Sequence, residues 1–243
     1  MPPVEGVQIF PITGLAEVSP GTDLAELIAG AVAPADPAGP ELAAGDVLVV
    51  TQKIVSKAEG RLVELDHADP AAKVALVRQE SVRVLRQRGD LVISETTHGF
   101  ICANAGIDLS NVEEGTAALL PEDADRSARR IRAGLENTLG LPLGVIVSDT
   151  FGRPWRRGVT DVAIGCAGVA AVIDLKGTTD AGGRELVATE ICVADELASA
   201  AELVMGKDRG IPVAVVRGVP AEWLRPASVR AEVIRPPDED LFR

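Results

Sequence analysis

Residues 145–158 combine acids, hydroxyls and arginines in a spacing suited to metal and phosphate binding. An apolar run that begins at Val145 leads directly into Ser148, Asp149 and Thr150. A carboxylate beside a hydroxyl suits a hard divalent cation such as Mg²⁺ or Mn²⁺, which prefers oxygen ligands. Arginines follow, and guanidinium groups bind phosphate or carboxylate through paired hydrogen bonds. They are Arg153, Arg156 and Arg157, with Trp155 placed to stack on a ring or a guanidinium.

A purely structural role for this segment is the alternative. Asp149 then caps a turn, and the arginines pair with surface carboxylates of an acidic protein. Of the polar segments in the chain, this is the one for which we favour binding over a structural role.

Two further polar segments follow apolar runs. Residues 49–61 carry Lys53 and Lys57, whose ammonium groups suit phosphate oxygens. Taken alone, these lysines are better explained as ordinary side chains of a solvated loop. Residues 104–111 place Asp108 in a glycine-containing turn, where it either binds a hard cation or closes an Asx-turn. Taken alone, that segment slightly favours the turn.

The surrounding elements must bring these segments together. Short apolar runs predict buried strands, which cover residues 47–50, 91–93, 143–147, 186–193 and 213–216. Apolar residues at the 3.6-residue period predict helices, which cover residues 23–32, 71–88, 123–139 and 195–205. Thr22 is the expected N-cap of the first helix and Gly206 the C-cap of the last. The mixture predicts an α/β or α+β fold with its polar segments at strand ends.

Composition excludes several classes of function. The 243 residues carry 36 acidic and 24 basic side chains, a formal net charge of −12. This argues against nucleic acid or an anionic membrane as the main partner, because both select basic surfaces. Two histidines and three scattered cysteines exclude a His-rich or zinc-type site, so any metal is held by oxygen. No export signal, membrane span or P-loop motif is present, and we expect a cytoplasmic protein.

Four sequence motifs together resemble the coenzyme F420-0:L-glutamate ligases, also called F420 γ-glutamyl ligases. They are GDVLVVTQKIVSKAEGR, NAGIDLSNV, SDTFGRPWRRG and VADELASAAELV. The likeness runs from about Ile9 to about Val219, most of the chain. It implies an α+β fold of two interwoven lobes that assembles as a homodimer. We expect residues 1–243 to form one such unit, without a C-terminal nitroreductase-like domain.

The resemblance also implies a reaction. The family uses GTP and one or two Mg²⁺ or Mn²⁺ ions, with K⁺ as a further candidate, to join L-glutamate to the carboxylate of the deazaflavin F420-0. An acyl phosphate is the intermediate, and further γ-linked glutamates follow. Phosphoryl transfer between anions needs charge neutralisation more than a histidine base, which agrees with this composition. The implied partners are small molecules and a second copy of the chain.

Site residues carry over motif by motif. Asp108, Asp149 and Thr150 match the family's metal-binding positions. The nucleotide-binding positions are matched by Leu15, Ala16, Glu17, Val18, Gln52, Lys57 and Asn111. Gln52 departs from the pattern, since Ser or Thr is usual there. We expect Asp108, Asp149 and Arg153 to be catalytic, and the remaining anion-binding candidates are Lys53, Arg156 and Arg157.

Two alternative functions remain at this point. A related metal-dependent amide ligase with another acceptor would keep the same metal and nucleotide motifs. A non-catalytic binder of F420 or of a nucleotide would bind its ligand without releasing GDP.

Overall fold

The computed structural model describes residues 6–241, except residues 34, 38 and 111. In this part of the chain the largest sheet has five strands in the order β1-β12-β2-β8-β9. Neighbours are antiparallel except β2 and β8, which run parallel. The strands are β1 (Gln8–Ile12), β12 (Val213–Arg217), β2 (Val47–Thr51), β8 (Gly144–Gly152) and β9 (Val159–Ala167).

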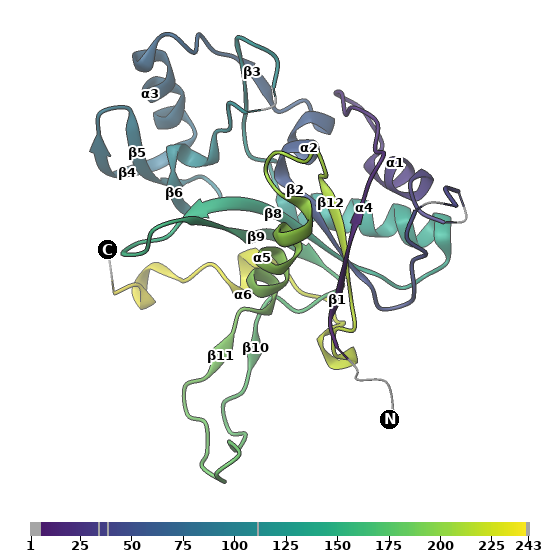
Figure 1. Ribbon diagram of the computed structural model, residues 1–243. Helices are drawn as coiled ribbons and strands as arrows, with labels where there is room; N and C mark the ends of the chain where they lie inside the picture. The colour runs from purple at the N-terminus through teal and green to yellow at the C-terminus, as the bar shows by residue number, and fades with distance from the viewer. Residues whose placement is uncertain (1–5, 34, 38, 111, 242–243) are drawn as a thin grey trace.

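Helices cover both faces of this sheet (Figure 1). Along β2, Leu48 and Val50 join the core beneath one set of helices, whereas Val47 and Val49 join the core beneath the other. A strand that is apolar on both faces in this way requires cover on both sides. The first set is α1 (Leu24–Gly30), α2 (Gln52–Ala58) and α4 (Ala124–Leu139); the second is α5 (Val193–Met205) and α6 (Val229–Glu232).

Helix α4 lies very close to β9 at Gly165. A Cβ atom on this glycine would lie 2.3 Å from the backbone carbon of Ala124, at the start of α4. We therefore expect Gly165→Ala to destabilise the protein by about 3 kcal/mol or more, because backbone cannot yield as a flexible side chain does. Chemical denaturation checks this, with Gly152→Ala as the control, since Gly152 faces open space. Equal stability of the two variants would contradict the close packing.

Smaller units surround the central sheet. Above it in Figure 1, a three-stranded sheet packs with α3 over a small core that contains Val77, Val92 and Ala105. Its elements are α3 (Pro70–Gln79), β4 (Ser81–Arg88), β5 (Leu91–Thr96), β6 (Ile101–Ala103) and the 3-10 turn η1 (Asn104–Gly106).

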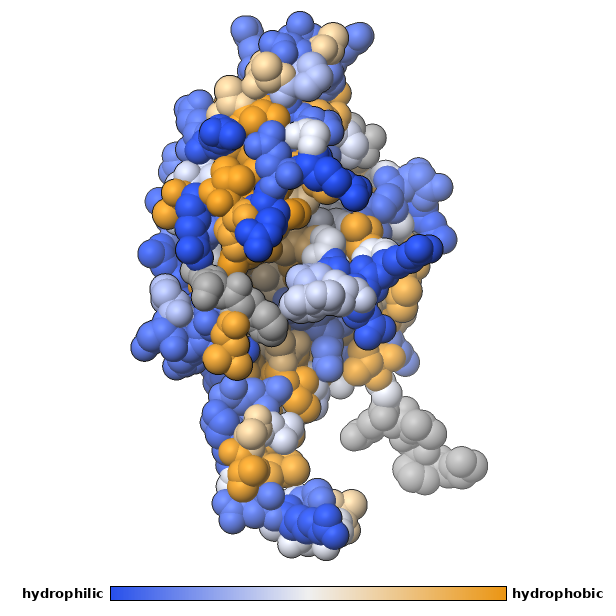
Figure 2. Space-filling model, turned by 90° about the vertical axis from the view of Figure 1, so that its left-hand side faces the viewer, coloured by the Kyte–Doolittle hydropathy of each residue, from blue (hydrophilic) through white to orange (hydrophobic). Residues whose placement is uncertain are grey.

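Two strand pairs and two short turns complete the described part of the chain. β3 (Leu62–Glu64) pairs with β7 (Thr116–Ala118). β10 (Ile173–Asp174) and β11 (Glu190–Ile191) form the base of an arm that projects from the body in both Figure 1 and Figure 2. The remaining 3-10 turns are η2 (Ala221–Trp223) and η3 (Pro237–Glu239).

The structure corrects several predicted elements. The helix expected over residues 71–88 ends at Gln79, and the rest is strand β4, in which valines alternate with polar residues. Of the strand expected over 186–193, only Glu190–Ile191 is extended. Asp23, not Thr22, caps α1, because its side chain accepts the N–H groups of Ala25 and Glu26. The segment after β2 is helix α2 rather than a loop.

Other predictions are confirmed. Strands β2 and β12, helix α4, and helix α5 with Gly206 as its C-cap lie close to where the sequence places them. Strand β8 starts as predicted but runs on to Gly152, beyond the predicted end at Val147. The α+β class is also confirmed, whereas the two interwoven lobes and the homodimer stay predictions. Across the described residues, no helix has the length and apolar character needed to cross a bilayer.

Candidate functional site

The ends of two parallel strands create the site. β2 and β8 pair in register from Val47 opposite Gly144 to Thr51 opposite Ser148, where β2 ends and β8 runs on to Gly152. Ligands commonly bind outside the carboxyl ends of such strands. A cavity of about 870 Å³ opens there, within the usual range for small-molecule sites.

The cavity gathers most of the residues predicted from the sequence. Those among its lining are Leu15, Ala16, Glu17, Val18, Gln52, Lys53, Lys57, Asp108, Asp149 and Thr150. Asn111 lies outside the described residues. The three arginines are not part of the lining; they lie at the exposed tip of the β8–β9 hairpin, residues 153–158.

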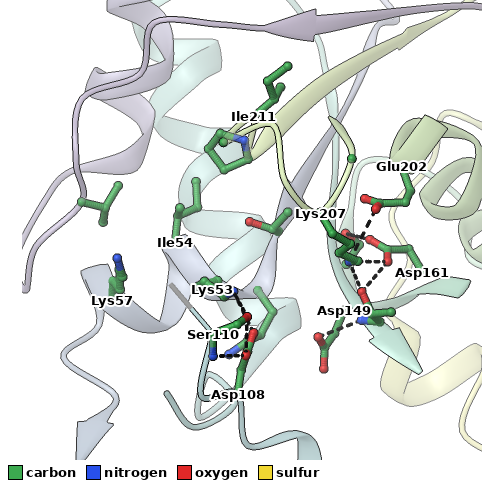
Figure 3. A pocket seen from close by; sticks show the side chains of 18 of the residues that line it. Lys53, Ile54, Lys57, Asp108, Ser110, Asp149, Asp161, Glu202, Lys207 and Ile211 are labelled. Carbon is green, nitrogen blue, oxygen red and sulfur yellow. Dashed lines mark hydrogen bonds and ion pairs between the residues drawn. The ribbon is translucent and has the colours of Figure 1, made fainter. Parts of the chain in front are cut away.

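Asp108 faces the cavity and is already well satisfied. Its carboxylate lies 2.9 Å from the ammonium nitrogen of Lys53, and it accepts the N–H and hydroxyl of Ser110 at 2.7 and 2.8 Å (Figure 3). Burial opposes ionisation, but the bonds from Lys53 and Ser110 outweigh it and hold the pKa of Asp108 below its usual value. The turn and the cavity-facing carboxylate, set out above as alternatives, therefore coexist.

Asp149 differs from Asp108 because its surroundings disfavour the charged carboxylate. Its pKa is raised to about 7, mainly by burial and also by the nearby charges of Asp108 and Asp161. The N–H of Thr150 at 2.8 Å and the charge of Lys207 oppose this shift. The side chain is partly exposed, toward the cavity that it lines. A carboxylate surrounded by like charges in this way gains from an added cation.

The raised pKa of Asp149 predicts how stability depends on pH without metal. The folded state favours the neutral acid, so its stability falls as pH rises from about 4 to about 7 and is then level. Asp149→Asn keeps the shape but not the charge. We expect it to exceed the native chain in stability by about 1–2 kcal/mol at pH 8, a value reduced for partial exposure, and by little at pH 4.5.

Denaturant unfolding in EDTA measures both differences. A stability gap of the same size at pH 4.5 and pH 8 would show that the charge on Asp149 does not cause it.

Three further residues of the site were not predicted. Asp161 on β9 is 1% exposed and accepts the hydroxyls of Ser148 and Thr150 at 3.2 and 2.6 Å. The ammonium group of Lys207 lies 3.0 Å from Asp161 and also contacts the hydroxyl of Thr150. Glu202 near the end of α5 lies 3.7 Å from Lys207. Together they hold Thr150 at the cavity wall.

Gln52 is placed differently from an ordinary ligand-binding side chain. It is 1% exposed, and its amide nitrogen donates to the hydroxyl of Ser56 at 2.6 Å and to the carbonyl of Leu119 at 3.0 Å. The amide thus fastens α2 to the segment after β7. The nucleotide contact of Gln52 stays a prediction. That of Lys57 also stays a prediction; its ammonium nitrogen lies 2.5 Å from a carboxylate oxygen of Glu17.

The charge balance of the cavity bears on which ligands it accepts. Among the described residues that line it, six carboxylates face three ammonium groups. A polyphosphate would be repelled there unless cations came with it. No group of three or more His, Cys, Asp or Glu side chains in the described part of the chain forms a ready metal cage. The pair Asp108 and Asp149 with Thr150 instead fits Mg²⁺ or Mn²⁺, because Mg²⁺ usually binds one or two carboxylates together with substrate phosphates.

Comparison with known proteins places the chain among characterised sequences. The family model described as F420-0:Gamma-glutamyl ligase matches residues 14–218. A protein of Methanothermobacter thermautotrophicus, named coenzyme F420:L-glutamate ligase, is 41% identical over 98% of this chain and 99% of its own length. Proteins with that name from Methanopyrus kandleri and Methanocaldococcus jannaschii are 43% and 39% identical, over 98% and 82% of this chain and 98% and 85% of their own lengths.

Proposed function

The chain belongs to the F420-0:gamma-glutamyl ligase family, and from that premise we propose that it joins L-glutamate to the carboxylate of F420-0 with GTP as the energy source. Further γ-linked glutamates follow the first. The observation that carries the proposal is the meeting of Asp108 and Asp149 with Lys53, Lys57 and Lys207 in one cavity. This set of groups suits a metal-bound nucleotide.

A divalent cation has an assigned place in this proposal. Asp108, Asp149 and Thr150 would hold Mg²⁺ or Mn²⁺, as one ion or two, with K⁺ as a further candidate. When bound, the ion supplies positive charge that offsets the charge of the phosphates. The carboxylates contribute ligands, and Asp161 keeps the hydroxyl of Thr150 oriented by accepting its hydrogen bond.

The lysines would bind the phosphates of the nucleotide, and an apolar wall would bind its base. Lys53 and Lys57 lie one turn apart on α2, so both ammonium groups face the cavity from the same side (Figure 3). They bind phosphate oxygens. The apolar side chains of Leu15, Ile54 and Ile211 form a wall suited to the purine ring.

The reaction then proceeds in two displacements. A carboxylate oxygen of the acceptor attacks the γ-phosphorus, the bond to the bridging oxygen breaks, and GDP leaves. The glutamate amine next attacks the carbonyl carbon of the acyl phosphate, inorganic phosphate leaves, and the amine gives up a proton as the amide forms. Positioning and charge neutralisation carry both steps, and the cavity offers little acid–base machinery beyond these groups.

A direct assay tests the proposal. The protein is incubated with F420-0, L-glutamate, Mn²⁺ and GTP, and mass spectrometry follows glutamyl products and GDP. We expect both, with ATP in place of GTP giving much less. A folded protein that binds F420-0 or GTP without releasing GDP would instead be a binder, and products with other acceptors only would indicate a related amide ligase.

The assembly is a separate part of the proposal. We expect a homodimer whose substrates are all small molecules, and light scattering coupled to gel filtration measures this. A monomeric mass across micromolar concentrations would contradict it.

A further inference from the structure

The β8–β9 hairpin continues beyond the cavity and ends in a charged, aromatic tip. The tip, residues 153–158, is exposed along its whole length, and Trp155 is 86% exposed. In Figure 1 it extends away from the central sheet, toward the side that faces the viewer in Figure 2. Its cationic side chains are Arg153, Arg156 and Arg157.

These arginines form no ion pair with a carboxylate in the part of the chain that the structure describes. Within the described residues none of the three forms an ion pair, although acids outnumber bases in the chain by 36 to 24. Some arginines elsewhere are paired: a guanidinium nitrogen of Arg217 lies 2.7 Å from a carboxylate oxygen of Asp46, and one of Arg225 lies 2.6 Å from Glu232. The structural alternative, in which the tip's arginines bind surface acids, is therefore not what the described part shows.

The backbone of the tip holds an uncommon conformation. Trp155 has a φ of +59°, in the left-handed region that costs a non-glycine residue about 1–2 kcal/mol. The guanidinium group of Arg153 donates a hydrogen bond to the carbonyl of Arg157 at 3.1 Å, which closes the loop. Strain of this kind persists where the surrounding structure imposes it, and it gathers at ligand-binding segments.

The tip is continuous with the cavity. Val159, the first residue of β9, lines the cavity and is 63% exposed, and its partner across the hairpin is Gly152. The strand side of the cavity, with Asp149 and Asp161, lies across from the α2 side with Lys53 and Lys57 (Figure 3). A group held at the tip would thus approach the phosphates from the side opposite the two lysines.

We propose that this tip binds the acceptor of the ligase reaction. The proposal rests on the proposed function. The arginines bind acidic groups of the acceptor, and Trp155 stacks on its planar ring. F420-0, a deazaflavin that carries a carboxylate, has both features. Guanidinium groups bind carboxylates strongly through paired bonds, and an indole face offers a broad stacking surface.

Binding of F420-0 to the apo protein, without GTP or metal, tests the proposal separately from catalysis. We expect Arg156→Ala/Arg157→Ala to weaken F420-0 binding at least about tenfold, and Trp155→Ala about as much. Trp155→Phe keeps a stacking ring and should stay within about threefold. The matched control is Arg129→Ala/Arg130→Ala on α4, which removes the same charge from another exposed surface.

The measurement is a titration of deazaflavin fluorescence, with Mn²⁺·GDP binding followed in parallel by calorimetry. The proposal predicts that every variant binds Mn²⁺·GDP as the native chain does. Native-like F420-0 binding by the tip variants would overturn it, as would a loss of GDP binding instead, or failure of the native chain to bind F420-0. Native binding without turnover would reject the proposed function while leaving this inference intact.

Discussion

Replacing Asp149 with alanine is expected to lower kcat by about 10³-fold or more, to background. The carboxylate lies on β8 in the cavity lining, where we propose it as one of two acids that hold a cation against the phosphates. Without it, the charge that develops in phosphoryl transfer is left uncompensated. The fold should survive, because the variant removes a group whose ionisation burial already disfavours.

Product formation by mass spectrometry, together with a thermal melt, measures this effect. The matched control is Asp195→Ala, which removes another largely buried carboxylate that accepts a backbone N–H but lies outside the cavity lining. We expect the control to keep its turnover within about threefold. If the Asp149 variant turned over as well as the Asp195 variant, the metal assignment would be wrong.

Replacing Lys207 with methionine is expected to lower kcat about 10²-fold and, in the absence of nucleotide, to strengthen Mn²⁺ binding. The two effects have one cause. The ammonium group contacts Thr150 and Asp161 and lies 3.7 Å from Glu202, so it supplies positive charge where phosphates are expected. The same charge repels a divalent ion while the site is empty of nucleotide.

Steady-state kinetics and a Mn²⁺ titration by electron paramagnetic resonance separate these two readouts. Lys176→Met is the control: this lysine also pairs with carboxylates, 2.5 Å from Glu190, but belongs to the β10–β11 arm. A Lys207 variant with weaker Mn²⁺ binding would show that the lysine orders the acids rather than competing with the cation.

The sequence predicts the buried strands better than the smaller units. Val47–Val50 is apolar on both faces, and such a run has few options other than a central strand. The secondary structure of residues 71–88 is harder to predict, because Val74 and Val77 follow the helical period while Val82 and Val84 fit a strand. β4 forms a hairpin with β5 across the turn at Gly89 and Asp90, and this pairing makes the second half of the segment a strand.

The residues of the site also differ in how well the sequence predicts them. Asp108 and Asp149 follow apolar runs, so their presence near a strand end is readable locally. The position of Asp161 cannot be read from the local sequence, because it depends on the register of the β8–β9 hairpin. Val147 lies opposite Gly165, and a regular continuation would put Val162 opposite Thr150. An irregularity after Val147 puts Asp161 there instead.

Lys207 depends on the turn after α5. Gly206 takes a φ of +63°, which glycine adopts readily, and the next residue enters the cavity. The glycine is visible in the sequence as a helix end, but where the chain goes afterwards is set by tertiary packing.

Calorimetric titration of Mn²⁺·GDP into the native chain, Asp108→Asn and Asp149→Asn tests most directly whether two acids from separate segments share one cation with a nucleotide. We expect each substitution to weaken Mn²⁺·GDP binding at least about tenfold while the melting temperature of the protein stays close to native or rises. Native affinity in either variant would contradict it.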